Sequence, residues 1–422
     1  IETNHVLPDT SILPELFVKA FLSETAGGYI LKMVNYLKLP VIMRGLGFDK
    51  DSIALPVMEQ NICQSFEIDR LPPSLTITVN QKFSFLFFSI SKSQHIIPVK
   101  ITPWNMPEEN QKILHFIHNQ NIYNNSGFTI NNQSKMIHFS GKSSFSTDIN
   151  LPEGYTVCFD PGAEIDLING AAFISHAPVI INGTRKEPVI IHSSDCTGQG
   201  FTVLQANLGS TITHAVFSNL SSPGRHGWNL TGAVNFYESD VDISNTKFTN
   251  NVCEDALNII RSDFTITGCT FENIFADAFD SDFSTGKIIN SVFNNTGNDA
   301  MDFSGSIVGV IGCKISNAND KAVSVGEKSI SLVKQTEIIN SNIALSSKDL
   351  SILKVCKTNA VNCNYGLIAL IKKPEYGPAK ISTKEFVTEQ IDTLHLIERG
   401  SELNLNGTVI YGDQDGLAGR FY

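Results

Sequence analysis

The second half of the sequence repeats itself about every 22 residues, and this period restricts the folds that the chain can adopt. Alanine recurs at this spacing and is always followed by an apolar residue, as in Ala256–Leu257, Ala278–Phe279, Ala300–Met301 and Ala322–Val323. About fifteen residues after each alanine lies a second apolar column, at Phe248, Phe271, Phe293, Ile315 and Ile338. A period of this length with several short strands in each repeat is typical of a solenoid.

We predict that the chain is all-β and that residues 150–372 form a right-handed parallel β-helix with about 22 residues per turn. The apolar columns would stack in its interior. Leucine-rich repeats have a similar length but need a Leu and Asn framework that this sequence lacks. Residues 373–422 break the period, and we expect them to form a C-terminal strand cap.

The N-terminal part of the chain has a different pattern. Apolar residues in 12–37 and 108–119 follow helix-like spacing, whereas 75–79 and 82–90 resemble strands. We therefore expect residues 1–120 to form a small α+β domain. Residues 121–149, with their Asn-rich start, would then serve as a linker or as the N-terminal cap of the β-helix.

Composition excludes several classes of protein. Charged residues make up only 17% of the 422 residues and the formal net charge is −11, which argues against nucleic acid as a partner. No apolar run reaches 18 residues, so no membrane span is expected. The fold class and the low lysine content favour a secreted or cell-surface protein, and the oligomeric state stays open.

Acidic residues flank the buried alanine columns in the middle turns. One position before the alanine stand Asp255, Asp277, Asp299 and Lys321, and two positions after it stand Asn258, Asp280, Asp302 and Ser324. The residue between is apolar and points inward, so both flanking columns must point outward. Equivalent carboxylates on neighbouring turns would lie about 5 Å apart, the spacing of strands. Their repulsion requires a bound cation, a nearby Lys or Arg, or a raised pKa.

Two interpretations of these aspartates are open. The aspartates before the alanine are placed to cap bends through backbone N–H groups, which is a structural role. Asp280 and Asp302 lie on the strands and have no turn to cap, which favours a functional role. All ten histidines lie outside residues 227–394, so an imidazole acid or base on these turns is excluded.

Residues 254–329 resemble a family of secreted bacterial β-helix proteins of unassigned activity. A second, local resemblance joins Asp277-Ala-Phe-Asp280 and Asp299-Ala-Met-Asp302 to the calcium-dependent pectate lyases of family nine, with Ala in place of Gly. In those lyases the aspartates hold calcium and a lysine on the next turn is the base. Their lysine occupies the position of Ser324, whereas Lys321 stands one place before the alanine.

The second resemblance implies a calcium-assisted polysaccharide lyase that acts on a polymer containing uronic acids. Ca²⁺ would be held by Asp277, Asp280, Asp299 and Asp302, with Lys321 as the base. Arg261 would clamp the substrate carboxylate, because a guanidinium can bind it through two hydrogen bonds. Two alternatives remain. One is a glycoside hydrolase with Asp280 and Asp302 as its catalytic pair, and the other is a glycan-binding or surface protein without catalysis.

Overall fold

The computed structural model describes residues 14–25, 27–57, 62–65, 73–91, 93–103, 127–225 and 228–422. The chain divides into two compact units, residues 1–112 and 113–422. Helix is confined, within the described residues, to a short 3-10 turn η1 (Pro14–Leu16) and to α2 (Ala418–Phe421). Among the same residues no helix has the length and hydropathy needed to cross a membrane.

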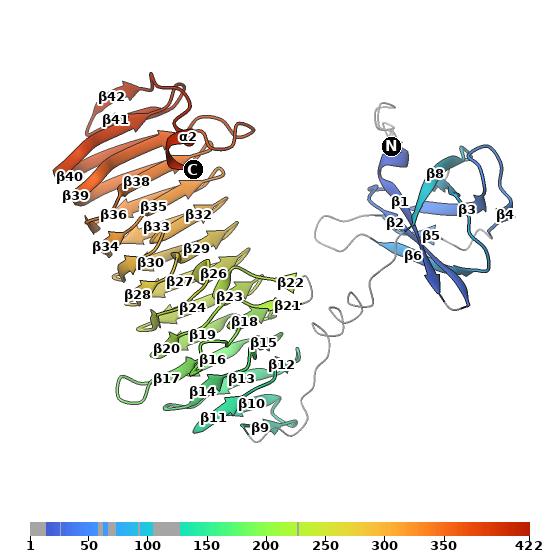
Figure 1. The fold of residues 1–422 in the computed structure, drawn as a ribbon, viewed down its shortest axis with the longest axis horizontal. Helices are drawn as coiled ribbons and strands as arrows, with labels where there is room; N and C mark the ends of the chain where they lie inside the picture. Colours follow the sequence, from blue (N-terminus) through green and yellow to red (C-terminus); the bar gives the residue numbers. More distant parts are fainter. Residues whose placement is uncertain are drawn as a thin grey trace, which may run out of the picture. The chain divides into compact units, whose positions relative to one another are not determined.

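The N-terminal unit is a β domain and not the α+β domain that the helix-like spacing suggested (Figure 1). Its sheet order is β4-β3-β7-β8-β1-β2-β6, and β5 pairs with β3. The strands are β1 (Val18–Thr25), β2 (Gly28–Asn35), β3 (Val41–Gly47), β4 (Leu55–Pro56), β5 (Ile62–Cys63), β6 (Ser74–Val79), β7 (Phe85–Ile90) and β8 (Ile97–Pro103). The strands expected at 75–79 and 82–90 are present as β6 and β7.

The helix expected in 12–37 is wrong, since this segment forms the hairpin of β1 and β2. Ala20 and Leu22 are buried at every second position, which is the period of a strand. Gly28 begins β2 with a φ of 139°, and a Cβ there would lie 2.7 Å from the Val79 carbonyl oxygen. Only glycine fits this turn, so the hairpin interrupts the helical spacing. The helix expected at 108–119 lies outside the described residues.

Residues 113–422 contain a parallel β-solenoid of about 12 turns with about 23 residues per turn (Figure 1). Its strands form three ladders along the solenoid axis, here called sheets one, two and three. This result confirms the β-helix fold that the repeat predicted.

The first two sheets consist of short strands. Sheet one contains β10 (Met136–Phe139), β13 (Thr156–Phe159), β16 (Val179–Asn182), β19 (Ser210–Thr213), β24 (Val241–Ser244), β27 (Asp263–Thr267), β30 (Thr285–Ile289), β33 (Ile307–Ile311) and β36 (Ile330–Lys334). Sheet two contains β11 (Lys142–Phe145), β14 (Glu164–Leu167), β17 (Val189–His192), β20 (Ala215–Ser218), β25 (Lys247–Thr249), β28 (Thr270–Ile274), β31 (Val292–Thr296), β34 (Lys314–Ala318) and β37 (Glu337–Ile339).

Sheet three carries the aspartates. It contains β12 (Ile149–Leu151), β15 (Phe173–Ser175), β18 (Phe201–Leu204), β23 (Gly232–Tyr237), β26 (Asp255–Ile260), β29 (Asp277–Asp282), β32 (Met301–Ser304), β35 (Lys321–Gly326) and β38 (Ile343–Lys348). A separate two-stranded ribbon, β21 (Gly224–Arg225) and β22 (Trp228–Asn229), leaves this sheet before β23.

The solenoid extends past 150–372 in both directions. At its start β9 (Phe128–Asn131) pairs antiparallel with β10, and β10 to β12 stack on the following turn, so part of the expected linker 121–149 is solenoid. At its end β39 (Ile352–Leu370) and β40 (Lys380–Ile397) bend through all three sheets and pair in parallel. Backbone pairing continues there although the side-chain repeat fades. The closing elements are β41 (Glu402–Leu405), β42 (Thr408–Tyr411) and α2.

The predicted inward columns form the solenoid core. The alanines and the apolar residues that follow them are fully buried, and Leu257, Phe279 and Met301 are register partners on successive strands. In the second column the rings of Phe248, Phe271 and Phe293 stack with centroids 4.6 Å apart. Stacking of like residues on every turn leaves no space between turns, and this rigid core sets the positions of the outward side chains.

Candidate active site

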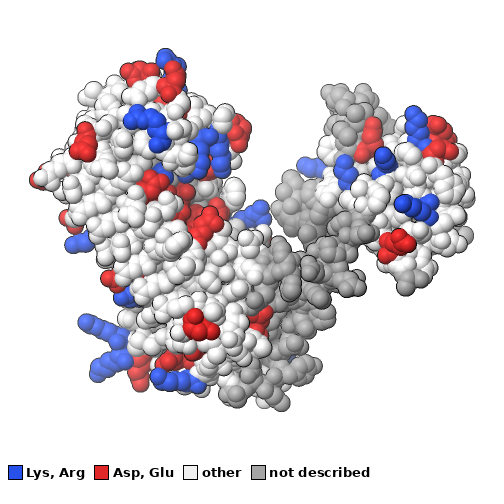
Figure 2. All heavy atoms as spheres, viewed as in Figure 1, with Lys and Arg blue, Asp and Glu red and all other residues white. Residues whose placement is uncertain are grey.

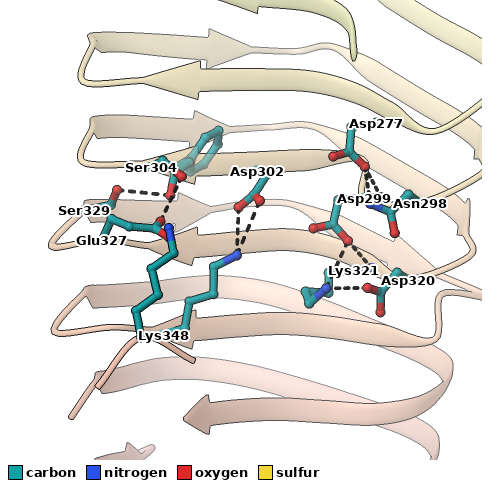
Figure 3. Close-up of polar contacts among 12 residues, drawn as sticks. Asp277, Asn298, Asp299, Asp302, Ser304, Asp320, Lys321, Glu327, Ser329 and Lys348 are labelled. Carbon is teal, nitrogen blue, oxygen red and sulfur yellow. Dashed lines mark hydrogen bonds and ion pairs between the residues drawn. The ribbon is translucent and has the colours of Figure 1, made fainter. Parts of the chain in front are cut away.

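Two polar columns run along the outer surface of sheet three, as the register predicted. The edge column lies where the strands begin and contains Asp255, Asp277, Asp299 and Lys321. The strand column lies three residues further along and contains Asn258, Asp280, Asp302 and Ser324, which are partners in the ladder. Figure 3 shows Asp277 and Asp299 of the edge column apart from Asp302 of the strand column, so these three carboxylates do not converge on one point.

The edge column is hydrogen-bonded within the protein. Asp277 Oδ1 accepts hydrogen bonds from the Asp299 backbone N–H at 2.7 Å and from Asn298 Nδ2 at 2.6 Å. Asp299 Oδ1 accepts one from the Lys321 backbone N–H at 2.9 Å and lies 3.4 Å from the Lys321 ammonium. That ammonium also pairs with Asp320. Asp277 and Asp299 therefore bond the next turn through its backbone, which is the structural role considered above.

The strand column has a different environment. Asp302 is paired with the ammonium of Lys348 at 3.4 Å, although the two residues stand 46 positions apart. Lys348 lies two turns beyond Asp302, and its side chain crosses Gly326 on the intervening strand. A Cβ at Gly326 would lie 2.5 Å from Lys348 Cε, so the glycine makes room for this contact. Asp280 Oδ1 is buried and has no hydrogen-bond partner among the described residues.

These environments move the two strand-column carboxyls in opposite directions. Burial, reinforced by the nearby Asp255 and Asp282 carboxyls, raises the pKa of Asp280 well above its usual range. Burial also acts to raise the pKa of Asp302, but the Lys348 ammonium together with Ser324 and Lys321 outweighs it, and the pKa is lowered. The environment of Asp280 therefore favours its protonated form and that of Asp302 its ionised form, on adjacent strands.

In the edge column, by contrast, the pKa values of the aspartates are all shifted in the same direction. Burial raises the pKa of Asp255 and of Asp277 to about 7 each. Burial and the neighbouring Asp302 also raise the pKa of Asp299, against the attraction of Lys321. A row of carboxyls on one surface thus carries less negative charge than its residue count suggests.

Neither basic residue expected to act on the substrate is free. Lys321 is 2% exposed, and its pKa is raised because the attraction of Asp299, Tyr422 and Asp320 together outweighs burial. A base must be deprotonated and must reach the substrate, so this environment does not suit the role. Arg261 is exposed, and its Nη1 donates to Glu238 Oε1 at 3.2 Å and to the Tyr237 hydroxyl at 3.3 Å.

The donor set does not fit calcium. The part of the chain that the structure describes holds no group of three or more His, Cys, Asp or Glu side chains placed to bind a metal ion. Calcium requires six to eight oxygen ligands, and lysine ammonium groups already pair with Asp299 and Asp302. The calcium site stays a prediction, and the chemistry proposed below does not depend on it.

Sequence reasoning missed three features of this surface. Lys348 lies four positions after Ala344, outside the two columns that were compared. Gly326 lies in the same column of the preceding turn, where Asp282 and Ser304 stand on earlier turns. A glycine next to a lysine in a stacked column is a signal that could have indicated the contact. Tyr422, whose ring lies 4.8 Å from the Lys321 ammonium and 5.6 Å from that of Lys348, had no signal in the repeat.

Comparison with known proteins gives remote likenesses only. No protein-family model and no curated protein matches the chain. Among solved structures, a mutant of the periplasmic alginate epimerase AlgG is 12% identical with a TM-score of 0.43, covering 65% of this chain and 81% of its own. The catalytic domain of a GH87 α-1,3-glucanase bound to nigerose is 11% identical with a TM-score of 0.38, covering 90% and 91%. An alginate lyase from Paenibacillus sp. str. FPU-7 is 11% identical with a TM-score of 0.34, covering 60% and 93%. At identities and TM-scores this low, the roles of individual residues in those proteins are not assigned to residues of this chain.

Proposed function

We propose that this chain hydrolyses glycosidic bonds in a polysaccharide, with Asp280 and Asp302 as the catalytic pair. The observation that carries the proposal is the opposite environment of two carboxyls at paired positions on neighbouring strands, β29 and β32. Glycoside hydrolysis needs one carboxyl that keeps its proton and one that is ionised, on either side of the scissile bond.

The proposed roles follow from the charges. Asp280 keeps its proton and donates it to the glycosidic oxygen as the bond to the leaving sugar breaks. Asp302, held ionised by Lys348, either accepts a proton from the attacking water or attacks the sugar carbon itself. Lys348 does not touch the substrate in this scheme and is a positioning residue.

Hydrolysis accounts for the site better than the lyase reaction expected from the local resemblance. A lyase of that type would use Lys321 as base, and Lys321 is buried in ion pairs with Asp299 and Asp320. Its clamp would be Arg261, which bonds Glu238. Because polysaccharides do not cross membranes, the proposal agrees with the expected secreted or cell-surface location.

Digestion of a polysaccharide panel tests the proposal. Alginate and an α-1,3-glucan, the polymers named for the similar structures, belong in the panel with uncharged glucans and mannans. We expect new reducing ends without the ultraviolet absorbance of unsaturated sugars. Asp280→Asn and Asp302→Asn should each reduce the rate about 10²–10⁴-fold.

The matched control is Asp242→Asn, an exposed aspartate on β24 of sheet one, which should keep full activity. Detection of unsaturated product would contradict hydrolysis and would indicate a lyase reaction. Reducing ends that survive in both strand-column variants would overturn the assignment of the pair.

A further inference from the structure

Acidic side chains gather on the outer surface around the catalytic pair (Figure 2). In Figure 2 acidic atoms gather on the solenoid where Figure 1 places β29 and β32, with basic atoms beside them toward the C-terminal end. The cations nearest to the pair are engaged, since Lys321 and Lys348 are buried in ion pairs with aspartates. Arg261 and Lys373 pair with Glu238 and Glu327 respectively. Lys372 is exposed, and its ammonium stands 3.8 Å over the ring of Tyr422.

Next to Asp280 the strand column presents a second hydrogen-bond acceptor without a partner. Asn258 is 1% exposed, and its Oδ1 has no hydrogen-bond partner among the described residues. The orientation of the Asn258 amide is set by its nitrogen, because Nδ2 donates to Thr231 Oγ1 at 2.8 Å and to Asp255 Oδ2 at 3.2 Å. Asn258 and Asp280 are ladder partners, so their unpartnered oxygens lie in one column. Asn258 Oδ1 can only accept, so a ligand that satisfies it must donate a hydrogen bond, as a hydroxyl does and a carboxylate does not.

An exposed aromatic ring stands directly after Asp282 at the end of β29. Phe283 is 60% exposed and has a φ of 52°, a conformation that bulky residues rarely adopt. A Cβ at Gly305 on the next turn would lie 2.6 Å from Phe283 Cδ1, so the ring lies against this glycine. The ring is thus supported from the protein side and still open to solvent. Aromatic faces carry partial negative charge and attract the C–H bonds on one side of a sugar ring.

We infer that this surface binds an uncharged polysaccharide, with one sugar ring stacked on Phe283 and hydroxyl groups donating to Asn258 and Asp280. The inference rests on the proposed function for the choice of a glycan, and it replaces the uronic acid polymer expected from the sequence. A polyanion would meet carboxylates whose nearest lysines, Lys321 and Lys348, are already held in ion pairs, while Lys372 lies over the Tyr422 ring. An uncharged sugar meets acceptors that its hydroxyls can satisfy.

Binding measurements by affinity electrophoresis and calorimetry test this at low ionic strength, with and without calcium. The probes are laminarin, dextran and galactomannan as uncharged polymers, and alginate and polygalacturonate as acidic ones. We expect at least one uncharged polymer to bind and the acidic ones not to. Phe283→Ala should weaken that binding about 3- to 10-fold. Tyr411→Ala removes another exposed aromatic ring, on β42, and should leave binding unchanged.

Several results would overturn the inference: no uncharged polymer bound, an acidic polymer bound as tightly, or Phe283→Ala equal to the wild type. Binding of an acidic polymer only in the presence of calcium would also overturn it and would support the calcium-dependent interpretation. The outcomes separate the two proposals. Binding of an uncharged polymer without cleavage would contradict the hydrolase proposal and support the inference. Cleavage of an acidic polymer to reducing ends would support the hydrolase proposal and contradict the inference.

Discussion

The edge column and the strand column have the same 22-residue spacing and the same residue type, and yet their carboxyls have different surroundings. Asp277 accepts two hydrogen bonds from the next turn, one of them from its backbone. Asp280, three residues later, leaves a buried oxygen without a partner among the described residues. Aspartates at a bend meet backbone N–H groups, whereas the N–H groups of a strand are already used in the ladder.

The difference also shows in how each column is paired with lysine. Lys321 follows Asp299 in the edge column, and its ion pair with Asp299 therefore lies within that column. Lys348 reaches Asp302 from two turns away and leaves Asp280 without a cation. The Lys321–Asp299 pair stabilises the stack of turns. The Lys348–Asp302 pair makes the pKa of Asp302 differ from that of Asp280. The predictions below test this division, beginning with the largest expected effect.

Lys321→Met should reduce the free energy of unfolding by about 3–5 kcal/mol. Removal of one partner from a buried ion pair leaves Asp299 buried without its cation. Denaturant unfolding near neutral pH measures the loss, and the acid limb of any hydrolysis by the folded protein should move less than in a Lys348 variant, because Lys321 lowers the pKa of Asp302 less than Lys348 does. A variant as stable as the wild type would contradict the structural role of the edge column.

Lys348→Met should shift the acid limb of the pH–rate profile upward by about 1–3 pH units. Without the ammonium, the pKa of Asp302 rises, so the carboxyl is ionised only at higher pH. Rates measured from pH 3 to 9 report the shift, with Lys321→Met as the comparison. An unmoved acid limb would remove Lys348 from its positioning role, even if the variant were less stable.

Asp277→Asn should weaken the dependence of stability on pH. The pKa of Asp277 is raised to about 7 in the folded protein, against about 3.9 in the unfolded chain. Its contribution is complete below about pH 4 and is lost as the pH rises through about 7. Wild-type stability should therefore increase between pH 8 and pH 5, and the variant should lack about 1–2 kcal/mol of that increase because neighbouring carboxyls share the proton. Thermal unfolding across this range measures the slope, with Asp242→Asn as the control, and equal slopes would contradict the assignment.

Calcium should have the smallest effect. Lysines pair with Asp299 and Asp302, and the described residues include no group of three or more metal-ligating side chains, so we expect the same melting temperature in calcium and in chelator. The double variant Asp280→Asn/Asp302→Asn is the comparison. A calcium-dependent rise in the wild type that the double variant lacks would restore the calcium site predicted from the resemblance.

The fold and the placement of the aspartates could be predicted because both follow from a local period. Phe279 and Met301 had to face inward, so Asp280 and Asp302 had to face outward on adjacent turns, as the ladder shows. The N-terminal domain could not be predicted in this way. Its apolar residues fit a helical period over 12–37. The segment forms strands because the turn at Gly28 packs against Val79, far along the chain.

The sequence by itself determined the solenoid, its inward columns and a face with two rows of carboxyls, because side chains that repeat every turn must stack. Only the tertiary structure decided which of those carboxyls has its pKa raised and which has it lowered. The Lys348 side chain passes over Gly326 to reach Asp302, a contact between residues 46 positions apart that the 22-residue spacing does not specify. Charge at a buried carboxyl depends on the few ångströms to the nearest cation, and that distance is set by packing between turns.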